Sequence, residues 1–168
     1  MAMRWGKVVI TVVAAVAISA NSVVLSAAPR LHDSLVLGGC RTSFAPPVFD
    51  PADGRLHFDI DGSCFVTPFG PASVHIDQRA AINEDGSLGS AEADITYTFS
   101  NGDTLLAFST SESGPPNAQG VFEFTATQWF IGGTGRFAHA TGTTLSTIGV
   151  VDTVHLLGAF AFSADLQF

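Results

Sequence analysis

From residue 55 onward, the chain alternates between apolar and polar residues with a period of two. The clearest alternating runs are 55–60, 74–77, 91–99, 122–127 and 160–168. In a β-strand this alternation places the apolar side chains on one face. No convincing helical repeat occurs beyond the first 28 residues. The pattern therefore predicts an all-β fold of about eight short strands.

Turn-forming dipeptides separate these runs and indicate hairpin connections. Such pairs accept the positive φ that tight hairpin turns require, and they are Asp53-Gly54, Asp61-Gly62, Asp85-Gly86 and Asn101-Gly102. A longer exposed loop is expected over 113–117. A sheet of this kind has to protect its edges, and closing into a barrel does so. We therefore expect a single antiparallel barrel of about eight strands over residues 54–168.

Residues 29–53 show no clear alternation. Pro46-Pro47 and Asp50-Pro51 lie within this stretch and favour turns or an extended arm. We expect an irregular segment here that leads into the barrel domain.

The first 28 residues have the composition of a secretory signal. Arg4 and Lys7 precede an uncharged apolar run over 8–20, and small residues follow it. A signal peptide over 1–28 predicts a secreted protein that leaves the membrane when the signal is removed. The alternative is a retained signal anchor, because the uncharged run continues to Pro29 and is just long enough to span a bilayer.

The chain beyond this segment is strongly acidic. It carries all fifteen Asp and Glu residues but only five basic residues, all Arg, so its net charge is near −10. Nucleic-acid binding depends on Lys and Arg that neutralise phosphates. The charge therefore excludes nucleic acid as a partner.

The two cysteines, Cys40 and Cys64, are the number needed for one disulfide in an exported chain. A rival interpretation reads Leu37-Gly38-Gly39-Cys40 as a lipoprotein cleavage box. In such a box the Cys follows the apolar run directly, whereas Arg30 and Asp33 intervene here. We expect the disulfide.

The most distinctive segment is Ile131-Gly132-Gly133-Thr134-Gly135-Arg136-Phe137-Ala138-His139-Ala140-Thr141-Gly142. A phosphate-binding loop would have to open a helix, and here the residues after Gly142 read as a strand. The structural interpretation is a turn in which Gly132, Gly133 and Gly135 adopt unusual backbone angles. Phe137 would then plug one end of the barrel, and Arg136 would donate to carbonyls left open by the turn.

This segment resembles the Gly-Gly-Thr-Gly-Arg-Phe turn of the allene oxide cyclase and dirigent-like barrel superfamily, in particular its exported bacterial members of unassigned function. The hairpin over 100–105, the strand start over 70–75 and the last strand from Gly158 are also similar to that group. The resemblance covers about residues 53–168. It implies an eight-stranded antiparallel barrel with a central cavity, and a homo-oligomer, since several members are dimers or trimers.

His75, Asp77 and Arg79 are the candidate ligand-binding residues, because they alternate with Val74 and Ile76 and share one strand face. That face is either the lumen, where they would form a polar ladder, or the solvent side, where they would be an ordinary exposed stripe. No His-x-His or His-x-x-x-His spacing occurs, so neither a metal site nor a cofactor is expected.

Three functions remain open at this stage. The leading hypothesis is an exported barrel that binds a small apolar molecule in its lumen. The alternatives are an isomerase or cyclase that works in the same cavity, and a structural barrel with a filled core. An eight-stranded barrel can be filled or can hold one small ligand, so the cavity decides between them.

Overall fold

The computed structural model describes residues 34–84 and 87–168, and the signal expected over 1–28 lies outside this range. The described chain forms nine strands and one short 3-10 helix, η1 (Gly135–Phe137). The strands are β1 (Ser34–Phe44), β2 (Val48–Asp50), β3 (Arg55–Thr67), β4 (Gly70–Ile82), β5 (Leu88–Phe99), β6 (Thr104–Ser113), β7 (Val121–Gly133), β8 (Thr141–Asp152) and β9 (Leu157–Gln167). Within the described residues, no helix has the length and apolar character needed to cross a membrane.

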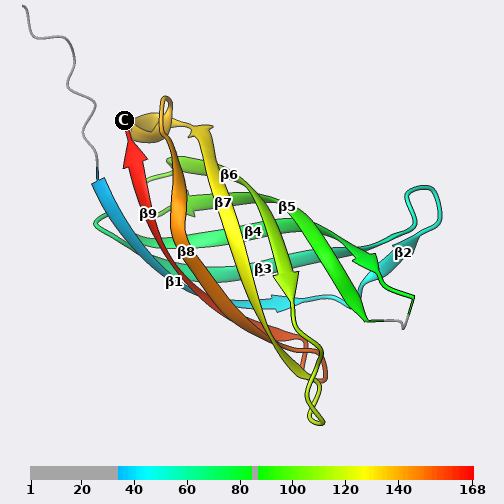
Figure 1. Ribbon diagram of the computed structural model, residues 1–168. Helices are drawn as coiled ribbons and strands as arrows, with labels where there is room; N and C mark the ends of the chain where they lie inside the picture. Colours follow the sequence, from blue (N-terminus) through cyan, green and yellow to red (C-terminus); the bar gives the residue numbers. More distant parts are fainter. Residues whose placement is uncertain (1–33, 85–86) are drawn as a thin grey trace, which may run out of the picture. The chain divides into compact units, whose positions relative to one another are not determined.

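The eight long strands form one closed antiparallel ring (Figure 1). Strands β3 to β9 pair in sequence order, and β1 pairs with both β9 and β3. This last pairing joins the two edges of the sheet, so the ring has no unpaired edge strand to protect. The prediction of a single antiparallel barrel of about eight strands is confirmed.

The predicted irregular segment over 29–53 is wrong, because it contains the barrel strand β1 and the short strand β2. The inward residues of β1 are Val36, Gly38 and Cys40, and they do alternate with outward residues. Two of the outward residues are also apolar, since Leu35 and Leu37 are 60% and 52% exposed. With apolar side chains on both faces, the strand lacks the polar alternation that marks the other strands.

Strand β2 continues the path of β1 along β3. Phe44 of β1 pairs with Ile60, and Val48 of β2 pairs with His57 after the two prolines at 46 and 47. Proline has no N–H to donate to the hydrogen bonds of a sheet, so the two prolines interrupt the pairing with β3. This interruption separates β1 from β2 and falls where the chain leaves β9. The free side of β2 has no strand partner within the described residues, and its three-residue length keeps this edge short.

One predicted turn, Asp61-Gly62, lies instead in the middle of β3. Asp61 points outward, and Gly62 sits where β1 approaches so closely that a Cβ would clash with the Arg41 carbonyl. The glycine is therefore needed for strand packing and not for a turn. Asn101-Gly102 does form the β5–β6 turn, with Gly102 at φ 86°. Residues 85 and 86 lie outside the described residues.

The inward faces of the strands form the apolar core. Its main cluster draws residues from every long strand except β8, and its largest fully buried side chains include Tyr97, Phe137 and Leu105. A smaller cluster of Phe58, Ala80 and Ala91 lies toward the ends of β3 and β4. The core is thus continuous at one end of the barrel and thinner at the other.

An aromatic plug fills the end of the barrel at which the core is continuous. There, η1 and the C-terminus lie together (Figure 1). Phe137 is fully buried, and its ring contacts those of Phe69, Phe99 and Phe168, with centroids 4.9 to 6.0 Å apart. The Arg136 guanidinium lies 5.0 Å from the Phe137 ring centroid. Its Nε also lies 3.3 Å from an Asp103 carboxylate oxygen. The arginine therefore binds a carboxylate and three aromatic faces, whereas the sequence predicted contacts with open carbonyls.

The glycines of the turn allow this plug to form. Gly132, Gly133 and Gly135 all have positive φ, and Gly135 has φ 57°. A Cβ on Gly135 would clash with the Asp103 carboxylate. This position is therefore closed to other residues both by its backbone angle and by its neighbour.

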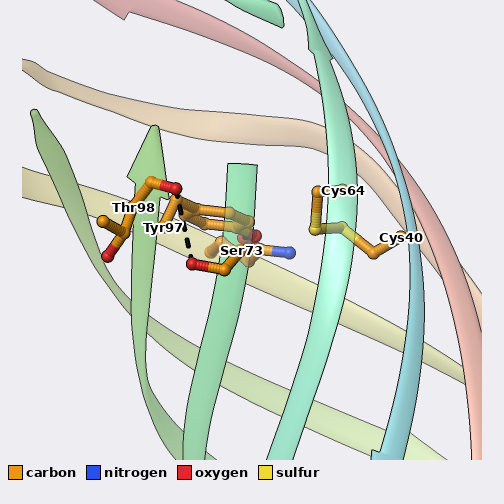
Figure 2. The surroundings of a disulfide bond; sticks show 6 residues. Cys40, Cys64, Ser73, Tyr97 and Thr98 are labelled. Carbon is orange, nitrogen blue, oxygen red and sulfur yellow. Dashed lines mark hydrogen bonds between the residues drawn. A yellow bond between two sulfur atoms is a disulfide. The ribbon is translucent and has the colours of Figure 1, made fainter. Parts of the chain in front are cut away.

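The predicted Cys40–Cys64 disulfide is confirmed. The two residues are directly opposite each other on β1 and β3, and both side chains are buried. Figure 2 shows the bond across these two strands, near the Ser73 hydroxyl that donates to the Thr98 carbonyl between β4 and β5. The disulfide thus crosslinks the strand pair that closes the ring.

We expect Phe137→Ala to lower the free energy of unfolding by about 3–5 kcal/mol, because it leaves a cavity in the plug. The matched control is Phe65→Ala on the outer face, where the side chain is 61% exposed. That change should cost less than about 1 kcal/mol. Chemical denaturation of both variants measures the difference, and equal losses would contradict the plug.

We expect a Cys40→Ala/Cys64→Ala variant to lose about 3 kcal/mol of unfolding free energy, because the bond closes a loop between residues 24 apart. Thermal melts with and without reductant provide the measurement. The wild type should melt at a lower temperature when it is reduced, and the variant should not respond to reductant. A reductant-insensitive wild type would contradict this role.

Candidate functional site

A cavity opens at the end of the barrel opposite the plug. Its volume is about 90 Å³. This is the end at which the β6–β7 and β8–β9 hairpins lie (Figure 1). The residues that line it are Thr42, Phe44, Phe58, Ile60, Ile76, Gln78, Ala80, Leu88, Gly89, Ala91, Ala93, Ile95, Ser109, Ser111, Ser113, Phe122, Phe124, Ala126, Gln128, Thr147, Val151, Gly158, Ala159 and Phe160. The lumen is therefore packed at the plug and keeps a small cavity toward the mouth.

None of these lining residues carries an ionisable side chain. Most of the wall consists of aromatic, aliphatic and alanine side chains, with serine, threonine and glutamine as its polar members. General acid–base catalysis needs a group that gives or takes a proton within hydrogen-bond reach of the substrate. The cavity wall offers apolar contact and neutral hydrogen bonds, and no such group.

Three buried polar side chains lie on neighbouring strands of the wall: Ser109 on β6, Gln128 on β7 and Thr147 on β8. Ser109 and Gln128 are direct cross-strand partners. The register between β8 and β9 shifts between Thr144 and Ser146, and Leu145 and Ser146 both point outward. This β-bulge lets Thr144 and Thr147 both face the interior.

Tyr97 lies behind Gln128. Its hydroxyl donates to Gln128 Oε1 over 2.9 Å. Burial raises the pKa of the Tyr97 phenol, and the hydrogen bond to Gln128 only partly opposes this rise. Tyr97 therefore stays protonated near neutral pH and positions the glutamine side chain.

His75, Asp77 and Arg79 point outward from β4, whereas Val74 before them and Ile76 between them are buried. None of the three lines the cavity. The ladder inside the lumen that we considered for them is thus wrong, and the solvent-side alternative is the arrangement observed. The physical reason is that the apolar side chains of β4 are buried on its inner face. The charged side chains, which alternate with them, therefore take the outer face.

On the outer face these residues belong to a charged network across β3, β4 and β5. Asp59, Asp77 and Asp94 are directly opposite one another, an arrangement in which like charges repel. Basic side chains offset this repulsion: His75 Nδ1 lies 3.6 Å from Asp59 and 3.0 Å from Asp61, and Arg79 donates to Asp94 over 3.2 Å. The hydrogen bond that His75 donates to the Asp61 carboxylate raises the pKa of His75 despite some desolvation.

Two groups on this surface have the composition of metal ligands. Asp59, Asp61 and His75 form one, and Asp50, Asp53 and His57 form the other, each with its candidate ligand atoms within 4.8 Å of one another. All six side chains are exposed or half-buried. In both groups a histidine ring nitrogen already lies within hydrogen-bond distance of a carboxylate oxygen. A hydrogen bond between the two side chains therefore explains why they lie close together.

A broader groove of about 1230 Å³ crosses the outside of the barrel, mainly over β1, β3, β7, β8 and β9. Its apolar surface includes Phe65, Ile148 and Val150. Small residues such as Gly39 and Ala161 also line it. The groove is open to solvent and lacks buried polar groups, so the enclosed lumen is the stronger candidate site.

No family model, curated protein or solved structure matches this chain. The resemblance of residues 131–142 to the allene oxide cyclase and dirigent-like turn stays a prediction.

The sequence analysis missed the polar residues of the lumen. Extending the alternation of 122–127 by one step places Gln128 on the inner face, so that signal was present. Tyr97 could be found in the same way from the run over 91–99. Thr147 could not, because the bulge at Leu145 and Ser146 breaks the period of two.

We expect His75→Gln to destabilise the protein at about pH 5 and to have little effect at about pH 9. A raised folded-state pKa means that the stabilisation is complete below the ordinary histidine value of 6.5 and is lost as the pH rises through the folded value. The loss at low pH should not exceed about 1 kcal/mol, because the side chain is exposed. Thermal melts across pH measure it. With Asp61→Asn in place, the pH dependence of the substitution should shrink, and an undiminished effect would contradict the assignment.

Proposed function

We propose that this chain is an exported barrel that binds a small, uncharged and mainly apolar molecule in the open half of its lumen. The observation that carries this proposal is a cavity lined by apolar and neutral polar side chains with no ionisable group. Ligand pockets in proteins combine such an apolar wall with a few placed polar groups. Export rests on the composition of residues 1–28 and fits the disulfide, which persists in oxidising compartments.

The size of the cavity limits the ligand. Its volume of about 90 Å³ is smaller than the ~150 Å³ apolar cavity that holds benzene. A molecule held wholly inside is therefore compact. A larger molecule, one the size of toluene included, would place one end in the cavity and the rest at the mouth, beside Phe44, Phe58 and Leu88.

The alternative functions are less well supported. A cyclase or isomerase here would have to act through the shape of the cavity, because Tyr97 is protonated and hydrogen-bonded away behind Gln128. A purely structural barrel would have no need to keep one half of the lumen hollow while the other half is packed with aromatic rings. Membership of the allene oxide cyclase and dirigent-like superfamily is part of the proposal, and it rests on the turn at residues 132–137.

We expect Ala126→Leu to weaken the binding of toluene at least tenfold, because the larger side chain occupies the cavity that Ala126 lines. The stability of the variant should be little changed, since the added carbons enter an existing void. Isothermal titration calorimetry measures binding, and a thermal melt verifies the fold.

The matched control is Ala161→Leu, an exposed outward position on β9 that lines the outer groove. It should bind toluene as the wild type does. Loss of binding in Ala161→Leu but not in Ala126→Leu would move the site to the groove. Absence of saturable toluene binding by the wild type would overturn the lumen site.

A further inference from the structure

The buried polar groups of the lumen point to a specific feature of the ligand. We propose that the lumen ligand carries one uncharged hydrogen-bonding group, a hydroxyl or a carbonyl, that binds at the polar wall formed by Ser109, Gln128 and Thr147. The apolar body of the ligand would then extend toward the mouth. This inference rests on the proposed function and names the chemical class of its ligand.

Thr147 provides the first observation. The residue is 3% exposed, its side chain is part of the cavity wall, and its Oγ1 has no hydrogen-bond partner within the described residues. A buried hydroxyl without a partner costs stability, so native proteins rarely retain one. A ligand group that reaches this wall would supply the missing partner.

Thr144 provides a comparison on the same strand. It also faces the interior, and its Oγ1 accepts a hydrogen bond from the Gln128 backbone N–H over 2.9 Å. It does not line the cavity. The two threonines thus differ in their hydrogen bonding. The Thr144 hydroxyl, away from the cavity, has a partner in the protein, and the Thr147 hydroxyl, at the cavity, has none among the described residues.

Gln128 and Ser109 complete the polar wall. The Gln128 oxygen accepts from Tyr97, and an amide also carries two donor hydrogens on its nitrogen. Ser109 lies directly opposite Gln128 and is 5% exposed, and its hydroxyl makes no hydrogen bond within residues 34–84 and 87–168. The wall therefore offers an amide donor and two hydroxyls that can donate or accept, which matches a neutral oxygen on the ligand.

A charged ligand group does not fit this wall. Burying a charge is costly unless an opposite charge pairs with it, and no lining residue is ionisable. A hydrocarbon fits this wall less well too, because it would leave the Thr147 hydroxyl without a hydrogen-bond partner. The geometry favours a neutral oxygen-containing group over both.

The test compares phenol with toluene, which have the same shape and differ by a hydroxyl in place of a methyl group. The measured quantity is the ratio of the toluene Kd to the phenol Kd, so that general changes in the cavity cancel. In Thr147→Val this ratio should fall about two- to tenfold, because the hydrogen bond to phenol is lost. In Ser109→Ala it should also fall. In the matched control, Thr144→Val, the ratio should be unchanged.

Stability provides a second readout without ligand. Thr147→Val removes an unsatisfied hydroxyl and should melt at the same temperature as the wild type or higher. Thr144→Val removes a made hydrogen bond and should melt lower.

The outcomes separate the two proposals. If toluene and phenol both bind but the ratio is unchanged in Thr147→Val and Ser109→Ala, the inference is wrong and the lumen site stands. If neither probe binds the wild type, the lumen site fails and the inference fails with it. Should Thr147→Val not fold, Ser109→Ala alone decides the question.

Discussion

The pairing of β1 with β3 is the interaction on which the rest of the structure depends. It joins the two edges of the sheet that runs from β1 through β9 to β3, and it turns an open sheet into a closed one. Closure removes the edges and creates an inside that solvent does not reach freely. The Cys40–Cys64 bond lies within this pair, where a covalent link best preserves the closure.

Once the ring is closed, the side chains inside it divide the lumen into two halves. Phe69, Phe99, Phe137 and Phe168 fill the end beside η1 and hold the Arg136 guanidinium against their faces. Toward the other end, the inward positions of β5 and β6 are mostly small, with Ala91, Ala93 and Ser109 among them. The cavity therefore results from residue size along strands that continue through both halves.

Closure of the ring also keeps charged side chains on the outer face and out of the lumen. Asp59, Asp77 and Asp94 stand opposite one another on the outer face, where water and the nearby cations reduce their repulsion. Within residues 34–84 and 87–168, the buried polar side chains are all neutral. A charged interior would have to bear the cost of desolvation, whereas neutral hydroxyls and amides need only hydrogen-bond partners. This division makes the lumen suited to neutral ligands.

The sequence by itself determined the all-β class, the barrel and the disulfide, because each follows from local pattern or composition. Alternation such as that of 91–99 separates the two faces of a strand, and two cysteines allow one pair. It could not find β1, whose outward Leu35 and Leu37 are as apolar as its inward residues. Nor could it assign His75 to the outer face, because a period of two separates the faces without naming the inner one. Only the tertiary structure decided that question, together with the position of Thr147 beyond a bulge and the hollow half of the lumen. These features depend on which strands meet across the ring, and that information is not local to any segment of the chain.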